Sequence, residues 1–543
     1  MQTTINAIDW VAIVAYAVLL CGIALYHSRR MRTQDDILLA GRSMSRWPIA
    51  LSMYMALFST NSFVGVTGWL NRPDGTVWIG LQNIGIMMAV PLVVWLYPAF
   101  FFRLRVSTAY EYLERRFGYS VRMFAALFFL AVRLMWMSTM LYSCSLIVSL
   151  MLGWTPDRGF EHGQVWAIII IGAMGAFMAL AGGMRAVIWT DVVQFFIMMG
   201  GVVTMAIFAL SRCGGLGAFA KTSVQCGKLN PPAFFSLTDD LSMVSGLCLG
   251  FIAMLSSSGS DQMILQTYLT ARSEQEAKAS LWRNGFLLKP LSLMFPLLGL
   301  IMFVYYHYHP EVASLMRIPD DALPVFVLNV LPSGMRGLMI LAIVSAALTS
   351  LGSGMAAMSA AAQVDFIRRW RKRPLSDRGA VLLGRSLLFL WGVTIVLVAL
   401  WVKTLGTKHN VIQILNILMY PFAGVLLGIF LLGMLTTRAN TPGTLLGAIS
   451  GFVVTVAVPL SSLLVKIITA SGTPIPVAIT PRISKLSEIS NFYYGAWGVL
   501  ATVLLGYLAS LVFKSPPALK LAGLTHWDPP EPLAAPAAEA AGR

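Results

Sequence analysis

Two short stretches place polar side chains in the middle of long apolar segments. In ALFSTNSFVGVTG, residues 56–68, four polar residues follow one another at 59–62. In MLSSSGSDQ, residues 254–262, three serines precede a glycine, a fourth serine and Asp261. Hydroxyl, amide and carboxylate oxygens are ligands for hard cations and hydrogen-bond partners for polar solutes. These stretches therefore favour reversible binding of a cation and a polar solute.

A third stretch, AIVSAALTSLGSG, adds oxygens that such a cation site would need. Thr349 and Ser350 supply adjacent hydroxyls. Ala346 lies three residues before Thr349, so its carbonyl falls on the same helix face. With carbonyls freed at the first polar stretch, these groups would form a cage of neutral oxygens, weak enough to release sodium. Adjacent hydroxyls among small residues also serve close helix packing, and this alternative stays open.

The elements that carry these stretches are membrane helices. The chain has 543 residues, of which 57% are hydrophobic and 11% charged, with a mean hydropathy of +0.75. Apolar runs of about 20 residues recur along it, each long enough to cross a bilayer. We predict an all-α polytopic membrane protein with about thirteen spans. They lie near 8–27, 48–70, 77–102, 123–152, 164–181, 187–210, 241–263, 284–306, 335–365, 382–402, 410–434, 442–465 and 492–513.

The net charge of +16 follows the predicted topology. One set of alternate loops, together with the C-terminal tail, carries about 25 Lys and Arg residues against about 12 on the other side. This asymmetry predicts a multi-pass protein of the cell membrane with its N-terminus outside and its C-terminus in the cytoplasm. The basic charge therefore indicates orientation in the lipid bilayer rather than a nucleic-acid partner.

The two polar stretches are separated by about five predicted spans, which gives them opposite orientations in the membrane. This is the arrangement of an inverted five-plus-five repeat whose first helices are both discontinuous. Unwound backbone at mid-membrane is tolerated only where other groups satisfy it, and a bound cation and solute would do so. Serines that bond back to their own helix or pack against a neighbour are the alternative.

The sequence resembles the sodium:solute symporter family over roughly residues 8–440. The resemblance rests on AGRSMSRWPIALSM, YEYLERRFG, AGGMRAVIWTDVVQ, SDQMILQTYLTARSEQEAKASLW, VSAALTSLGSG and LLGMLTTRANTPGTLLGA. It implies a LeuT-type fold with one added helix before the ten-helix core. It also implies a secondary transporter, not an enzyme, that imports a small organic solute with sodium by alternating access.

The resemblance also implies sodium ligands. The common site would use the carbonyls of Met55, Phe58 and Ala346 and the hydroxyls of Thr349 and Ser350. A shifted register would put Ala346 and Ala347 at the hydroxyl positions and abolish the site. Asp191 and Ser353 match a second sodium site found in some members, although Gly352 stands where a serine would help.

Arg133, in LAVRLMWMSTMLYS, is the most informative candidate for the solute. A charge at that depth costs at least about 2.5–3.5 kcal/mol and needs a partner. The planar guanidinium suits a carboxylate, and the resembling sialic acid transporters place an Arg in this helix against the substrate carboxylate. An organic acid is therefore expected, and a structural Arg paired with a protein group is the alternative. The expected substrate residues are Ser59, Asn61, Ser62, Gln82, Arg133 and Asp261.

Other functions remain as alternatives. Sugar-transporting members carry a Lys at a fixed interval after the second break. Here that place falls on Leu288, and Lys289, one residue later, would be rotated by about 100°. An amino acid or sugar symporter, a nutrient sensor built on a transporter and an uncoupled channel are the rivals. A hydrolase is disfavoured, because His307 and His309 fall in a predicted outer loop, away from the serines.

The predicted organisation has five parts. They are the added helix and its loop at 1–45, the first repeat at 46–211, the outer loop and second repeat at 212–434, two C-terminal helices at 435–514 and a disordered cytoplasmic tail at 515–543. Cys213 and Cys226 share one predicted outer loop, where a disulfide and two free thiols are both compatible with the sequence.

Overall fold

The computed structural model describes residues 6–28, 40, 43–57, 60–104, 106, 108–156, 159–179, 184–367, 369, 377–406, 409–470, 486, 488–517 and 521–527. Within these residues the regular secondary structure is helical, joined by turns and loops, and one isolated bridge links Met44 and Ala271. Nine helices there are long and apolar enough to cross a membrane, and two bent helix pairs raise the number to eleven. Two shorter apolar helices complete the thirteen segments expected from the sequence.

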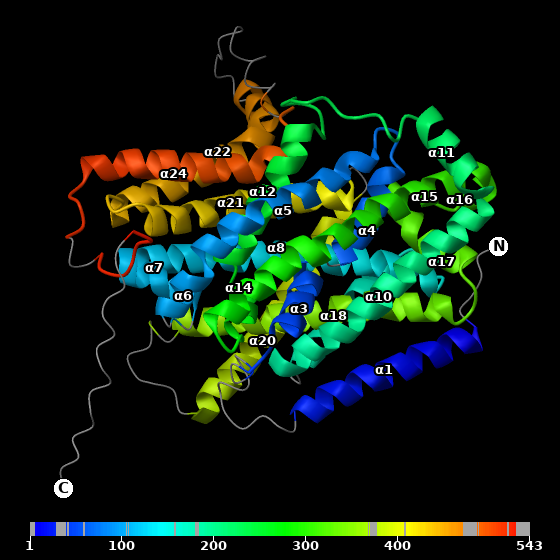
Figure 1. The fold of residues 1–543 in the computed structure, drawn as a ribbon, viewed down its shortest axis with the longest axis horizontal. Coiled ribbons are helices and arrows are strands. Elements are labelled where there is room, and N and C mark those ends of the chain that lie inside the picture. Colours follow the sequence, from blue (N-terminus) through cyan, green and yellow to red (C-terminus); the bar gives the residue numbers. More distant parts are fainter. Residues whose placement is uncertain are drawn as a thin grey trace.

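The helices have the following bounds, and Figure 1 shows their arrangement. They are α1 Ala7–Ser28, α3 Arg46–Leu57, α4 Thr60–Leu70, η2 Val77–Gly80, α5 Leu81–Leu96, α6 Pro98–Leu104, α7 Ala109–Phe117, α8 Tyr119–Met151, α9 Gly163–Ala179, α10 Met184–Arg212, α11 Gly215–Gln225, α12 Met243–Gly259, α13 Gln262–Leu269, α14 Glu274–Trp282, η4 Arg283–Leu288, η5 Lys289–Leu293, α15 Met294–Tyr308, α16 Pro310–Ala313, η6 Pro319–Asp321, α17 Ala322–Val330, α18 Met335–Ala361, η7 Ala362–Ile367, α20 Asp377–Leu405, α21 Val411–Leu435, α22 Thr441–Ala470, η8 Asn491–Tyr493 and α24 Tyr494–Val512.

Both polar stretches coincide with bends. The pair α3 and α4 meets at 54°, and the pair α12 and α13 meets at 62°. Phe58 and Ser59, at the first bend, lie outside the described residues. The discontinuity predicted for each helix is therefore present at the expected place.

Protein groups satisfy the backbone at the second bend. The hydroxyl of Tyr268 donates to the carbonyl of Ser258 at 3.1 Å, and that of Tyr110 donates to the carbonyl of Ser260 at 2.9 Å. Asp261 caps α13 by accepting from the amide of Met263 at 2.9 Å. These carbonyls therefore do not depend on a bound cation or solute, contrary to the expectation for this bend.

The helices outside the core flank it on two sides. The added helix α1 packs on α10 and α18, and α22 and α24 pack together on α21 at the opposite side of the molecule (Figure 1). Asp9 fixes α1 in place, because its carboxylate accepts from the amides of Gly334 at 2.8 Å and Gly337 at 3.0 Å. A carboxylate at this position also interacts favourably with the positive end of the α18 dipole.

The C-terminal tail is partly ordered, so the expectation of disorder over 515–543 is wrong for residues 521–527. The amide of His526 donates to the carbonyl of Met434 at 2.8 Å, and the indole of Trp527 donates to that of Leu435 at 2.8 Å. Tyr112 donates to the carbonyl of Leu524 at 3.1 Å. Residues 518–520 and 528–543 lie outside the described part of the chain.

Candidate functional site

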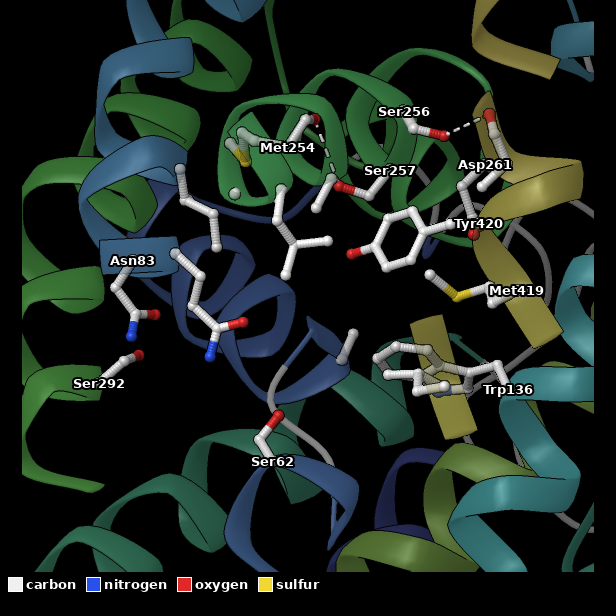
Figure 2. Close-up of a pocket in the computed structure, with 18 of the residues that line it drawn as sticks. Ser62, Asn83, Trp136, Met254, Ser256, Ser257, Asp261, Ser292, Met419 and Tyr420 are labelled. Atoms are coloured by element: carbon white, nitrogen blue, oxygen red, sulfur yellow. Dashed lines mark hydrogen bonds between the residues drawn. The ribbon is translucent and has the colours of Figure 1, made fainter. Parts of the chain in front are cut away.

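A cavity of about 160 Å³ lies between the two bent pairs (Figure 2). Residues from α3, α4, α5, α8, α12, η5, α15 and α21, together with Asp261 at the second bend, line it. Much of the lining is apolar, including Trp136, Met254, Phe295 and Met419. A space between helices, with a few polar groups in an apolar lining, is the usual form of a small-molecule site.

Four of the residues expected to contact the solute line this cavity. They are Ser62, Gln82, Arg133 and Asp261. Asn61 is buried elsewhere, where its side-chain oxygen accepts from the hydroxyl of Ser143 on α8 at 2.8 Å. Ser59 lies outside the described residues.

Arg133 already has a carboxylate partner in the protein. Its side chain is 4% exposed and its Nη2 forms an ion pair with Oδ1 of Asp261. The same carboxylate caps α13, so the pair joins α8 to the second bend. The guanidinium Nε is buried without a hydrogen-bond partner among the described residues. The pairing with a protein group that the sequence left open is therefore present.

The sequence reasoning missed Lys289, Asn83 and Ser292, which also line the cavity. The residue count from the second break placed the position of the sugar transporters' lysine at Leu288. Leu288 is buried and is absent from the cavity lining. The helix changes at this point from a π-helical turn, Arg283–Leu288, to a 3-10 turn, Lys289–Leu293. A regular α-helical count therefore fails here. The available signal was Pro290, which removes one helical N–H and crowds the preceding turn.

Of the groups expected to bind sodium, Met55 lies on α3, and Ala346, Thr349 and Ser350 lie on α18. The hydroxyl of Thr60, the first residue of α4, contacts the carbonyl of Ile343 on α18 at 3.4 Å. Ile343, Ala346 and Ser350 share one face of α18, because they are spaced by three and four residues. Met55 is buried near the end of α3. Thr349 belongs to α18, but its side chain lies outside the described part, as does Phe58.

Asp191 and Ser353, the residues of the candidate second sodium site, each have a protein partner. Asp191 is buried on α10 and accepts from the hydroxyl of Ser52 on α3 at 2.6 Å. Ser353 donates to the carbonyl of Ser350 in its own helix at 3.2 Å. Arg185, at the start of the same helix, donates to the carbonyl of Ala40 and the hydroxyl of Ser43.

A polar cluster joins the turn after α4, the short helix η6 and the start of α21. Asp320 accepts from the side chain of Asn410 and from the amide of Val411 at 3.0 Å. Asp240 accepts from Arg72 and from Gln413, each at 2.9 Å. Burial raises the pKa of Asp320 to about 8. We call Arg72, Asp240, Asp320, Asn410 and Gln413 the end cluster.

Cys213 and Cys226 are both free thiols, which decides between the two states that the sequence left open for them.

The amino-acid sequence is similar to those of sodium-coupled transporters. The sodium:solute symporter family model matches residues 37–451. A sodium/sialic acid symporter of Aliivibrio fischeri is 25% identical over 512 residues, which cover 94% of each chain. The human sodium-coupled monocarboxylate transporter 1 is 25% identical, with 93% of this chain and 87% of that protein covered.

A solved structure of a Na⁺-coupled sialic acid symporter, outward-open and substrate-bound, shares the fold. Its TM-score is 0.77 at 24% identity, and the match covers 94% of this chain and 99% of that one. The expected LeuT-type architecture of a multi-pass membrane protein is thus confirmed. The bent pairs, the cavity between them and the family match agree: the chain belongs to the sodium:solute symporter family and is a sodium-coupled solute transporter, not an enzyme.

Proposed function

We propose that this protein imports a small organic acid together with sodium by alternating access. The observation that carries the proposal is the charge of the cavity, which is lined by Arg133 and Lys289 but by one carboxylate, Asp261. A net positive charge inside a membrane is costly, and an anionic solute would offset it. The names of a sialic acid symporter and a monocarboxylate transporter among the relatives support an acid.

The sodium ion in this proposal binds where the first bend meets α18. Its ligands are the carbonyls of Met55, Phe58 and Ala346 and the hydroxyls of Thr349 and Ser350. The contact between Thr60 and Ile343 supports this placement, because it brings the start of α4 against α18 one turn before Ala346. Asp191 and Ser353 remain candidates for a second ion.

Coupling would follow from that placement. A bound cation would fix the angle between the bent pair α3–α4 and α18, and the same bent pair contributes Ala56, Ser62 and Val66 to the cavity. Sodium would thereby complete the solute site, and its release would loosen it. The sodium concentration gradient would drive the cycle, and the membrane potential would add about 2.3 kcal/mol per 100 mV for each net charge moved, which for a monoanion requires a second sodium ion.

The proposed orientation in the cell membrane follows the basic loops. The N-terminus is outside, the end cluster faces outward, and the segment 521–527 is cytoplasmic. Protease accessibility of the two termini in right-side-out vesicles tests this orientation.

Uptake into proteoliposomes tests the proposed function. Sialic acid, lactate, propionate, proline and glucose are each offered with an inward sodium gradient and again with choline. We expect sodium-dependent uptake of an acid alone. Glucose belongs in the panel because Lys289 lies in the cavity, and the resemblance associates a lysine after the second break with sugar transport.

The double variant Thr349→Ala/Ser350→Ala tests the sodium site. It should lose the sodium dependence of uptake, whereas Thr394→Ala, which removes a hydroxyl that bonds back to Leu390 within α20, should keep it. Equal uptake in choline by the unmodified protein would contradict sodium coupling. Sodium-driven uptake of proline or glucose alone would contradict the organic acid.

A further inference from the structure

Lys289 is a buried cation without a carboxylate partner among the described residues. Its side chain is 3% exposed and its Nζ lies 5.3 Å from the ring centroid of Tyr54. Arg133, the other cation of the cavity, pairs with Asp261. The charge that lacks a counter-ion in the cavity is therefore that of Lys289.

We propose that Lys289 binds the carboxylate of the transported acid, and that the Arg133–Asp261 pair positions the second bend instead of binding that carboxylate. This inference rests on the proposed function and assigns its anion to one residue. An ammonium group buried at this depth gains most from an anionic partner that arrives with the solute. A charge-assisted hydrogen bond between them is stronger than a neutral one.

Neighbouring polar groups support an anion at this end of the cavity. Lys289 and Ser292 are three residues apart in a 3-10 turn, so their side chains project from the same side. Figure 2 shows Ser292 beside Asn83, across the cavity from Asp261 and Tyr420. The hydroxyl of Ser292 donates to that of Tyr54 at 3.0 Å, which holds η5 against α3. The amide of Asn83 supplies a further donor.

The opposite side of the cavity accommodates the rest of the solute. Trp136, Met419 and Tyr420 gather there beside Asp261 (Figure 2). A second carboxylate on the solute would lie near Arg133, whose charge is already balanced by Asp261. An ammonium group near the bound carboxylate would be repelled by Lys289. The expected class is therefore a monoanion with a mostly uncharged body, ahead of dicarboxylates and of zwitterionic amino acids.

The test compares each acid with its uncharged amide. Sodium-driven uptake of sialic acid, lactate and propionate is measured against the corresponding amides, for the unmodified protein and for Lys289→Met. We expect the variant to lose about 10–100-fold in its preference for the acid, since one charge-assisted interaction is removed. Lys289→Arg should restore part of that preference. Lys221→Met, the same change at an exposed lysine, should leave it intact.

Several outcomes would overturn the inference. If Lys289→Met keeps the preference while Arg133→Gln abolishes it, Arg133 is the anion ligand. If the unmodified protein shows no preference for any acid over its amide, the proposed function fails as well. A merely structural role would lower acid and amide uptake equally. Should Lys289→Met fail to fold, Asn83→Ala must reduce the acid-to-amide ratio, and an unchanged ratio overturns the inference.

Discussion

Two buried cations in one cavity differ in how the protein compensates them. Arg133 has Asp261 as a partner, whereas Lys289 has the face of Tyr54 and no described carboxylate. Removing one member of a buried ion pair leaves the other uncompensated, while removing an unpaired charge does not. The two residues should therefore respond in opposite ways to neutral substitution.

Arg133→Gln should destabilise the protein by up to about 3–5 kcal/mol, because it leaves the part-buried Asp261 without its partner. Arg133→Gln/Asp261→Asn should recover much of that loss, since neither charge then remains. Thermal unfolding of the single and double variants in one detergent measures this as a double-mutant cycle. A single variant as stable as the unmodified protein, with only acid uptake lost, would instead indicate a direct role in binding the solute.

Lys289→Met should raise the unfolding temperature of the protein without solute, because an unpaired buried ammonium is replaced by an apolar side chain of similar length. Lys221→Met is the matched control and should leave that temperature unchanged, since Lys221 is exposed. A fall in unfolding temperature for Lys289→Met would mean that the contact with Tyr54 outweighs the cost of the buried charge.

At the scale of elements, the second bend depends on close packing at a glycine. A Cβ on Gly259 would lie 2.1 Å from Cζ of Tyr97, an atom of a fully buried ring. Gly259→Ala should therefore force α12 away from α5 and α6 and abolish uptake. Gly200→Ala is the control, because a Cβ there meets nothing within 4 Å and alanine favours the helix. Normal uptake by Gly259→Ala would show that the bend tolerates this displacement.

The end cluster should make opening of the cavity towards the outside depend on pH. The pKa of Asp320 is about 8 when the carboxyl is buried, against an ordinary value of 3.8. Between pH 3.8 and about 8, the carboxyl of Asp320 is protonated when it is buried and ionised when it is hydrated. Raising the pH across this window therefore shifts the equilibrium towards the hydrated, ionised state, by up to about tenfold per pH unit. The nearby Asp321 and Arg72 have opposing effects on that pKa.

Thiol labelling of Val66→Cys from outside, in a protein without other cysteines, measures this opening. Labelling should accelerate as pH rises towards 8, after correction for the reagent. Asp320→Asn should remove the dependence, and Asp239→Asn, at an exposed loop carboxylate, should keep it. A pH dependence that survives Asp320→Asn would assign the effect to another group.

The elements could be predicted from the sequence more fully than the contacts within the site. The bends were predictable because polar residues interrupt runs that otherwise satisfy the hydrophobic length of a span. The position of Lys289 in the cavity could not be predicted, because the helix near Pro290 changes into π and 3-10 turns, which a constant residue count ignores. The partner of Arg133 could not be predicted either, because Asp261 lies far away in the sequence and no local pattern connects the two residues.

At the scale of the whole molecule, the segment 521–527 ties the end of the chain to α7 and α21. Its backbone and the indole of Trp527 use the carbonyls of Met434 and Leu435 and the hydroxyl of Tyr112. Each such hydrogen bond contributes about 0.5–1.5 kcal/mol. A chain ending at residue 520 should therefore unfold at lower temperature than one ending at 527. Equal unfolding temperatures for the two truncations would show that this segment contributes nothing to stability.

The central claim is that one molecule couples an organic acid to sodium through the cavity between its bent helices. Coupling is reciprocal, so an acid gradient alone should move sodium into proteoliposomes that begin with equal sodium on both sides. We predict sodium entry with an inward gradient of the acid that the panel identifies, and none with a gradient of its amide. Sodium entry without any solute, or an acid gradient that moves no sodium, would contradict this account.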